Sequence, residues 1–151
     1  MNQPTQKILH GWLFTIALAH ILAGLALPLL SLLGGMEAYT NQLNTQFWQG
    51  QNVPAEAAEF QRWIIALFGP TVASWGVLMA YLVYAGARTG QRWPWDALLL
   101  AILVWAPADI AISLLQNFWP HVVLDMAAVI AIALPVWILR RHTPRLLTEN
   151  S

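Results

Sequence analysis

The sequence predicts an all-α polytopic membrane protein, an up-and-down bundle of four transmembrane helices. Four long apolar segments separated by polar breaks fill the 151 residues, and the charged residues lie at the ends of these segments. The chain is 58% apolar and only 9% charged, whereas a soluble domain carries roughly 25% charged residues. One span needs about 20 residues to cross a hydrocarbon core of about 30 Å. We therefore expect a single four-helix domain over residues 1–151.

The first span is expected over residues 8–33. Lys7 precedes it, and the polar and glycine residues from Ser31 to Gly35 end it. A secretory signal peptide is the alternative interpretation, but its apolar region is only about 7–15 residues long. The greater length of this segment therefore favours a membrane anchor.

A polar connection and the second span follow. Residues 35–60 are rich in Asn and Gln and form the predicted external loop. Pro54 suits the start of a helix, and Glu56 and Glu59 are favourable in its first turns because the helix dipole attracts negative charge. This helix should therefore begin outside the membrane and continue as the second span, residues 63–87.

The second span carries small residues at spacings of four, three and four. Small side chains at such spacings allow neighbouring helix backbones to approach closely. They predict a helix-packing seam, either within the bundle or between two copies of the chain. The seam residues are Gly69, Ala73, Gly76 and Ala80.

The last two spans are predicted over residues 97–115 and 122–139. Pro94 is tolerated only in the first turn of a helix, so it marks the start of the third helix. A tight turn at residues 116–121 joins the two spans, and a basic run that begins at Arg140 ends the fourth.

Basic residues set the expected orientation of the four spans. Cytoplasmic loops of membrane proteins carry an excess of Lys and Arg. One side of the predicted bundle carries six of them, and the other side carries only Arg62. We therefore expect both termini and the turn at residues 88–92 to face the cytoplasm. The six are Lys7, Arg88, Arg92, Arg140, Arg141 and Arg145.

Most tryptophans fall near the predicted span ends. Indole rings settle between the lipid tails and the headgroups, so these residues are expected to form an aromatic belt. The belt residues are Trp12, Trp63, Trp93, Trp95, Trp119 and Trp137.

Asp109 is the strongest candidate for a functional residue. It lies 13 residues beyond Asp96, which at 1.5 Å per residue places it roughly 20 Å into the third helix, near mid-membrane. A charge there costs at least about 2.5–3.5 kcal/mol on insertion scales, so a partner, a cavity or a proton must compensate. Ser113 and Gln116 continue its helical face as a polar stripe toward the outer surface.

His20 lies at a matching depth in the first span, roughly 17 Å from its cytoplasmic end. This depth would allow it to pair with Asp109 across the bundle. Three interpretations of the pair stay open, and ligand binding is the least expected of them. A structural polar clasp joins helices at a modest gain in free energy and is preferred, whereas a proton relay would use the same two ionisable groups.

His121 and Asp125 form a second candidate site, close to the outer boundary of the membrane. The two residues are one helical turn apart and could share a proton or a metal ion with Glu56 or Glu59. Two ligands on one helix without a defined third do not make a metal site. We therefore expect no metal and assign the pair to a hydrogen bond at the outer interface.

Cofactors and nucleic-acid partners are not expected. Without cysteine the chain has no disulfide, thiolate metal site or iron–sulfur cluster. Haem held by two histidines needs both imidazoles at one depth, but the predicted spans give no such pair at mid-membrane. The net charge of zero argues against a nucleic-acid-binding surface. The expected partners are the lipid bilayer and either a second copy or a larger membrane complex.

Spans two to four also carry short motifs. These are Phe68-Gly69-Pro70-Thr71 with Trp75-Gly76, then Arg92-Trp93 with Ala97-Leu98-Leu99, and then Trp105 with Asp109 and Ile112-Ser113-Leu114. In these motifs the chain resembles small four-span bacterial membrane proteins of the BphX-like and DoxX-like group. The resemblance implies a four-helix bundle in a bacterial inner membrane, with Asp109 as the polar position most worth testing.

Three functional classes remain open. One depends on the small-residue seam and one on the ionisable residues. The preferred one is a structural or accessory bundle that associates with itself or with a larger complex through the small-residue seam. The alternative is a small proton-coupled transporter or channel that uses His20 and Asp109, with Asp125 as a further candidate. The sequence shows no inverted repeat of the kind found in many transporters, so a transporter formed by this chain would need to oligomerise.

A membrane enzyme or redox helper for an apolar substrate is the third class. Trp75, Tyr81 and Trp105 would line its pocket. No nucleophile with a base, phosphate loop or cysteine pair supports this class. An enzyme is therefore the less expected outcome.

Overall fold

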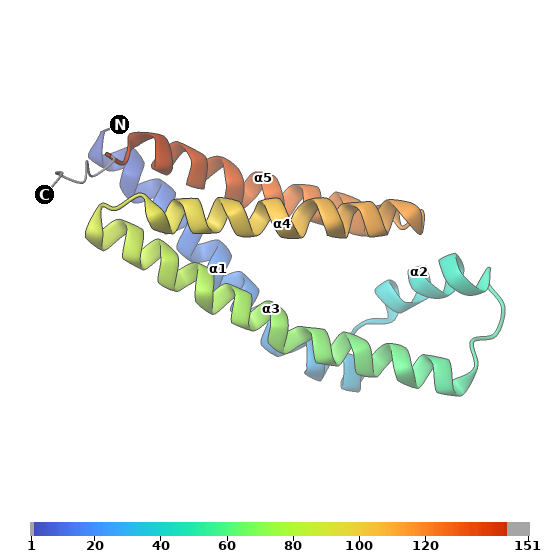
Figure 1. Ribbon diagram of the computed structural model, residues 1–151. Coiled ribbons are helices and arrows are strands. Elements are labelled where there is room, and N and C mark those ends of the chain that lie inside the picture. Colours follow the sequence, from blue (N-terminus) through green and yellow to red (C-terminus); the bar gives the residue numbers. More distant parts are fainter. Residues whose placement is uncertain (1, 145–151) are drawn as a thin grey trace, which may run out of the picture. The chain divides into compact units, whose positions relative to one another are not determined.

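The computed structural model describes residues 2–144, and all regular structure in this range is helical. Five helices follow one another: α1 (Gln3–Leu33), α2 (Glu37–Trp48), α3 (Ala55–Thr89), α4 (Trp93–Leu115) and α5 (Trp119–His142) (Figure 1). The all-α prediction is confirmed. Arg145, one of the basic residues used to predict the orientation, lies outside the described residues.

Four of the helices, α1, α3, α4 and α5, are long and apolar enough to cross a membrane. Only 17–33% of the residues in their most apolar windows are buried inside the chain, so large apolar side chains cover its outer surface. Leu100, Leu103 and Val104 of α4 are 62%, 68% and 69% exposed. Soluble monomers rarely expose such contiguous apolar surface. The prediction of a polytopic membrane protein is therefore confirmed.

The polar connection before α3 differs from the prediction. It contains the helix α2, although residues 35–60 were expected to form a loop, and α3 begins at Ala55, directly after Pro54 as predicted. Glu37 lies in the first turn of α2, where its negative charge interacts favourably with the helix dipole. The side-chain amide of Gln61 in α3 donates to Asn44 Oδ1 of α2 at 3.3 Å. The sequence of α2 has no apolar stripe that would have predicted a helix. In keeping with this, no residue of α2 is buried.

The helices form two compact units. Residues 2–17 and 78–144 make up the first, and residues 18–77 make up the second. Helices α1 and α3 contribute one part to each unit, α2 belongs to the second unit, and α4 and α5 belong to the first.

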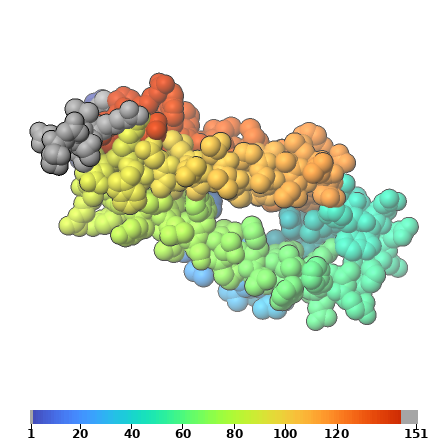
Figure 2. All heavy atoms as spheres, viewed as in Figure 1, coloured from blue at the N-terminus to red at the C-terminus, as the bar shows by residue number. Residues whose placement is uncertain are grey.

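Helices α4 and α5 form an antiparallel hairpin within the first unit. Figure 1 shows them side by side, and the space-filling view shows their side chains packed directly against one another (Figure 2). At the end of the hairpin away from the turn, the Arg140 guanidinium donates to the Asp96 carboxylate and forms an ion pair with it. This pair joins the start of α4 to the end of α5.

The turn between α4 and α5 is a Schellman motif of three residues, 116–118. Asn117 adopts a left-handed φ of 53°. Its N–H donates to the Leu114 carbonyl at 3.0 Å, and the Phe118 N–H donates to the Ser113 carbonyl at 2.9 Å. This pattern satisfies the last carbonyls of α4. Pro120 then lies in the first turn of α5, where its missing N–H is not needed.

Trp95 is the largest fully buried side chain of the first unit, only 1% exposed. The prediction that it belongs to the aromatic belt is therefore wrong, whereas its neighbour Trp93 is 50% exposed. The His10 ring of α1 stacks on the Trp95 indole with a centroid distance of 5.6 Å. Gly86 of α3 supplies the space, because a Cβ at that position would lie 2.7 Å from Trp95 Cε2.

We expect Gly86→Ala to lower the free energy of unfolding by about 1–3 kcal/mol, because the added methyl overlaps the buried indole. The matched control is Gly11→Ala in α1, where an added Cβ would have no neighbour within 4 Å. That change should be neutral or stabilise by up to about 1 kcal/mol, because Ala favours a helix over Gly. Thermal unfolding midpoints in detergent compare the two variants with wild type. Equal midpoints for both variants would contradict this packing.

The second unit contains a close approach of the α1 and α3 backbones. A Cβ at Gly24 of α1 would lie 2.5 Å from the Gly69 carbonyl oxygen and 2.9 Å from Ala73 Cα. The buried Ser31 hydroxyl donates to the Arg62 carbonyl at 2.8 Å. Two of the four predicted seam residues therefore pack against α1 of the same chain.

The other two seam residues are Gly76 and Ala80. Gly76 is buried in the second unit, whereas Ala80 belongs to the first unit and is partly exposed. A role for these residues between two copies of the chain stays a prediction.

Candidate functional site

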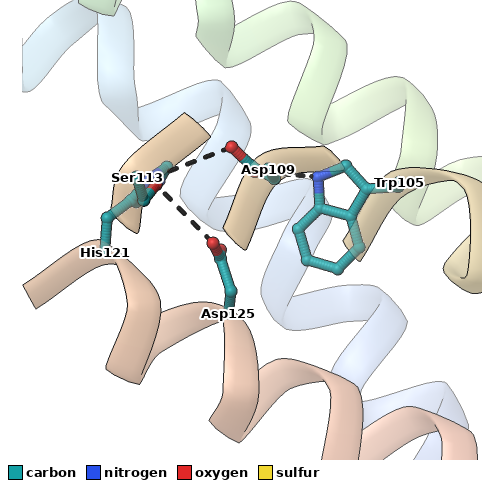
Figure 3. A network of polar contacts seen from close by, with 5 residues as sticks. All are labelled: Trp105, Asp109, Ser113, His121 and Asp125. Carbon is teal, nitrogen blue, oxygen red and sulfur yellow. Dashed lines mark hydrogen bonds and ion pairs between the residues drawn. The ribbon is translucent and has the colours of Figure 1, made fainter. Parts of the chain in front are cut away.

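Three ionisable side chains of the α4/α5 hairpin meet near its turn (Figure 3). His121 Nδ1 lies 3.9 Å from Asp109 Oδ1 and 4.0 Å from Asp125 Oδ2. One ligand atom from each of the three residues lies within 4.8 Å of the other two. Asp109, His121 and Asp125 are called the Asp–His–Asp site below.

The register of the hairpin explains why these residues meet. Asp109 and Asp125 are each six residues from the helix end at the turn, and Ser113 and His121 are each two residues from it. Because the turn is short, residues at equal distances from it lie at the same level. At 1.5 Å per residue the two carboxylates lie about 9 Å from the ends of their helices. Asp109 therefore lies in the half of α4 nearer the turn, and its depth in a membrane stays a prediction.

Two neighbouring side chains of α4 orient the site. The Trp105 Nε1–H donates to Asp109 Oδ2 at 3.0 Å, which leaves Asp109 Oδ1 on the side of His121. Ser113 is buried, and its Oγ is hydrogen-bonded to His121 Nδ1 at 2.9 Å. These two hydrogen bonds hold the Asp109 carboxylate and the His121 imidazole, whose potential ligand atoms point toward one another (Figure 3).

Asp125 is the most buried member of the site. Its side chain is 4% exposed, and those of Asp109 and His121 are 25% and 27% exposed. Asp125 Oδ2 is buried without a hydrogen-bond partner. At 4.0 Å from His121 Nδ1 it is beyond hydrogen-bonding distance, and an ion pair forms only when the imidazole is protonated. An isolated carboxylate in an apolar environment is unfavourable by several kcal/mol or more.

The site does not have the geometry of a serine hydrolase, although it contains Ser, His and Asp. In a catalytic triad the serine and the carboxylate contact opposite nitrogens of the imidazole. Here Ser113, Asp109 and Asp125 all approach the same atom, His121 Nδ1. Two carboxylates and one imidazole nitrogen converging on one point are instead suited to holding a cation.

The structure brings together residues that the sequence analysis had kept apart. The sequence predicts a polar stripe of Asp109 and Ser113, with His20 as the partner of Asp109, and a separate pair of His121 and Asp125 that lacks a defined third ligand. Asp109 supplies the third potential ligand atom. Asp109 and Asp125 are equally spaced about the turn at residues 116–118, whereas the longer turn predicted at residues 116–121 did not give equal spacing.

The remaining sequence candidates are not members of the Asp–His–Asp site. His20 is half-buried in the second unit, and its pairing with Asp109 stays a prediction. Glu56 and Glu59, the alternative partners of His121 and Asp125, are exposed residues of the second unit. Of the aromatic residues proposed to line an apolar pocket, Tyr81 is 65% exposed and Trp105 is hydrogen-bonded to Asp109.

No family model, curated protein or solved structure matches the chain. The resemblance to the BphX-like and DoxX-like group therefore stays a prediction. Since a fold alone does not define a function, the function is inferred from the Asp–His–Asp site.

Proposed function

We propose that the chain is a multi-pass protein of a bacterial inner membrane that binds a cation at the Asp–His–Asp site and acts as a subunit of a small cation transporter or channel. The observation that supports this proposal best is the buried Asp125 carboxylate oxygen without a hydrogen-bond donor. Ionisable groups inside membrane spans are rare, and they often mark pathways for ions or protons.

A purely structural bundle would not need this arrangement. An apolar residue in place of Asp125 would pack the hairpin without desolvating a carboxylate. The small-residue seam also offers less support for an accessory bundle, because Gly69 and Ala73 already pack against Gly24 of α1. We therefore favour a function that uses the charge of Asp125.

The proposed topology places both termini in the cytoplasm, because five of the six described Lys and Arg residues would then lie on that side. The turn between α4 and α5, and the site about 9 Å from it, would then lie toward the outer side. The partial exposure of Asp109 and His121 means that the protein does not enclose the site completely. The resemblance to four-span bacterial proteins supports the inner-membrane location, and the small size of one chain favours an oligomeric transporter.

Ion flux in proteoliposomes tests the proposal. Vesicles that contain wild-type protein and dyes sensitive to Na⁺, K⁺, Mn²⁺ or Zn²⁺ are exposed to a gradient of each ion, with a pH-sensitive dye to detect accompanying proton movement. We expect wild-type protein to raise the flux of at least one ion above that of empty vesicles, and Asp125→Asn to reduce it at least about tenfold, since the site loses a charged ligand.

Glu56→Gln is the matched control, because it removes an exposed carboxylate of the second unit. Its flux should equal that of wild type. Insertion and the elution profile in detergent are compared for all three proteins. Wild-type vesicles with no flux for any ion, or equal flux in wild type and Asp125→Asn, would overturn the transport function.

A further inference from the structure

We propose that the cation of the Asp–His–Asp site is a divalent transition metal ion of the zinc type, coordinated by Asp109, His121 and Asp125. This inference rests on the site of the proposed function and names the class of ion that it binds. The two distances from His121 Nδ1, 3.9 Å to Asp109 Oδ1 and 4.0 Å to Asp125 Oδ2, are its geometric basis (Figure 3).

The distances suit a single ion. Zinc binds nitrogen and oxygen ligands at about 2.0–2.2 Å, so two ligands of a tetrahedral ion lie about 3.4 Å apart and any two ligands at most about 4.4 Å apart. The two measured distances fall inside this limit. All three ligand atoms lie within 4.8 Å of one another, so side-chain shifts of about 1 Å or less close the site around an ion.

A second observation points to a ligand independently of this clustering. The Asp125 side chain is only 4% exposed, and its Oδ2, the oxygen on the side of His121, has no hydrogen-bond partner. Buried polar groups are normally paired in native proteins. A metal ion in the site would give this oxygen the partner that the protein does not supply.

Charge balance favours a divalent ion. Two ionised carboxylates that face the same point repel each other. A divalent cation neutralises both, with a neutral imidazole as the third ligand. A monovalent cation would leave one net negative charge in the membrane-spanning hairpin, which is unfavourable.

The types of ligand atom also limit which class of metal ion the site suits. Magnesium and calcium prefer six or more oxygen ligands, whereas an imidazole nitrogen suits zinc and the other borderline transition metals. The chain contains no cysteine, so the soft thiolate ligands that favour Cu(I) are absent. Three protein ligands leave one coordination position open, as in sites where the metal exchanges a water or a substrate.

Trp105 and Ser113 have different roles in this arrangement. Trp105 holds Asp109 by a hydrogen bond to the oxygen that faces away from His121, as outer residues of metal sites commonly do. Ser113 instead bonds to Nδ1, the nitrogen that would bind the ion. Metal binding must therefore displace the Ser113 hydroxyl, which can turn to a carbonyl of its own helix.

The test is direct metal binding to purified full-length protein without a polyhistidine tag, in detergent and after treatment with a chelator. Calorimetric titration with Zn²⁺ and the visible absorption of bound Co²⁺ report affinity and coordination, and Mg²⁺ is titrated as the comparison ion. We expect one Zn²⁺ per chain and no comparable binding of Mg²⁺. Asp109→Asn, His121→Gln and Asp125→Asn should each weaken binding at least about tenfold.

Three controls separate a metal site from the alternatives. His142→Gln and Glu56→Gln change exposed residues outside the site and should leave affinity unchanged. Ser113→Ala should bind Zn²⁺ at least as tightly as wild type, because it removes the competitor for Nδ1. Absence of Zn²⁺ binding to folded wild-type protein, or equal affinity in wild type and Asp125→Asn, would overturn the metal site. Zinc binding without ion flux would overturn only the transport function, and ion flux without zinc binding would overturn only this inference.

Discussion

Replacing Gly24 by alanine is expected to destabilise the second unit by about 3 kcal/mol, at the upper end of the usual effect of overpacking. The added Cβ would lie 2.5 Å from the Gly69 carbonyl oxygen and 2.9 Å from Ala73 Cα. Both obstacles are backbone atoms of α3, so no side-chain rotation can relieve the overlap. The two helices must move apart, and the contacts beside the crossing are lost with the displacement.

The matched control is again Gly11→Ala, which introduces the same methyl in the same helix where no atom lies within 4 Å. Thermal unfolding in detergent, followed by the loss of helical circular dichroism, measures both variants. Gly24→Ala should unfold at a clearly lower temperature and Gly11→Ala at the wild-type temperature or above. A wild-type midpoint for Gly24→Ala would contradict the close approach of α1 and α3.

The same variant separates two interpretations of the small-residue seam. If Gly69 and Ala73 serve packing within the chain, Gly24→Ala lowers the stability of the protein at every protein concentration. If they serve association of two copies, Gly24→Ala leaves the stability of the chain unchanged, and Gly69→Leu changes the oligomeric state seen in detergent. The contact between Gly24 and Gly69 favours the first outcome.

The four long helices could be predicted well from the sequence, because each of them has a local signal. Apolar length identified the four spans, and Pro54, Pro94 and Pro120 lie at or near the starts of α3, α4 and α5. Helix α2 carries no such signal, since it buries no residue. The burial of Trp95 could not be predicted either, because it depends on the space left by Gly86 in another helix.

The candidate site could be predicted only in part. Asp109 and Asp125 were identified because charges are unfavourable inside a span, but their meeting depends on the register of a hairpin. Counted from the predicted cytoplasmic ends of the helices, Asp109 and His20 have similar depths, but depth alone does not say which way a side chain points around its helix. Counting outward from the turn places Asp109 opposite Asp125 and Ser113 opposite His121.

Replacing Asp125 by leucine is expected to stabilise the metal-free protein by about 1–3 kcal/mol while abolishing metal binding. Leucine branches at Cγ as aspartate does, so it fills the same buried position without a charge. The carboxylate that it replaces has one oxygen with no hydrogen-bond partner, so little favourable interaction is lost. The measurement is the thermal unfolding midpoint in detergent with a chelator present, beside a Zn²⁺ titration of the same preparation.

Asp109→Leu is the matched variant on the facing helix, and it should behave differently. Asp109 is 25% exposed and accepts the Trp105 N–H, so its removal leaves that donor unpaired and should give no gain in stability. A lower midpoint for Asp125→Leu than for wild type would show that the carboxylate is a structural clasp of the hairpin. A higher midpoint with lost zinc binding would mean that the chain keeps Asp125 at the expense of its own stability, as expected for a residue retained to bind an ion.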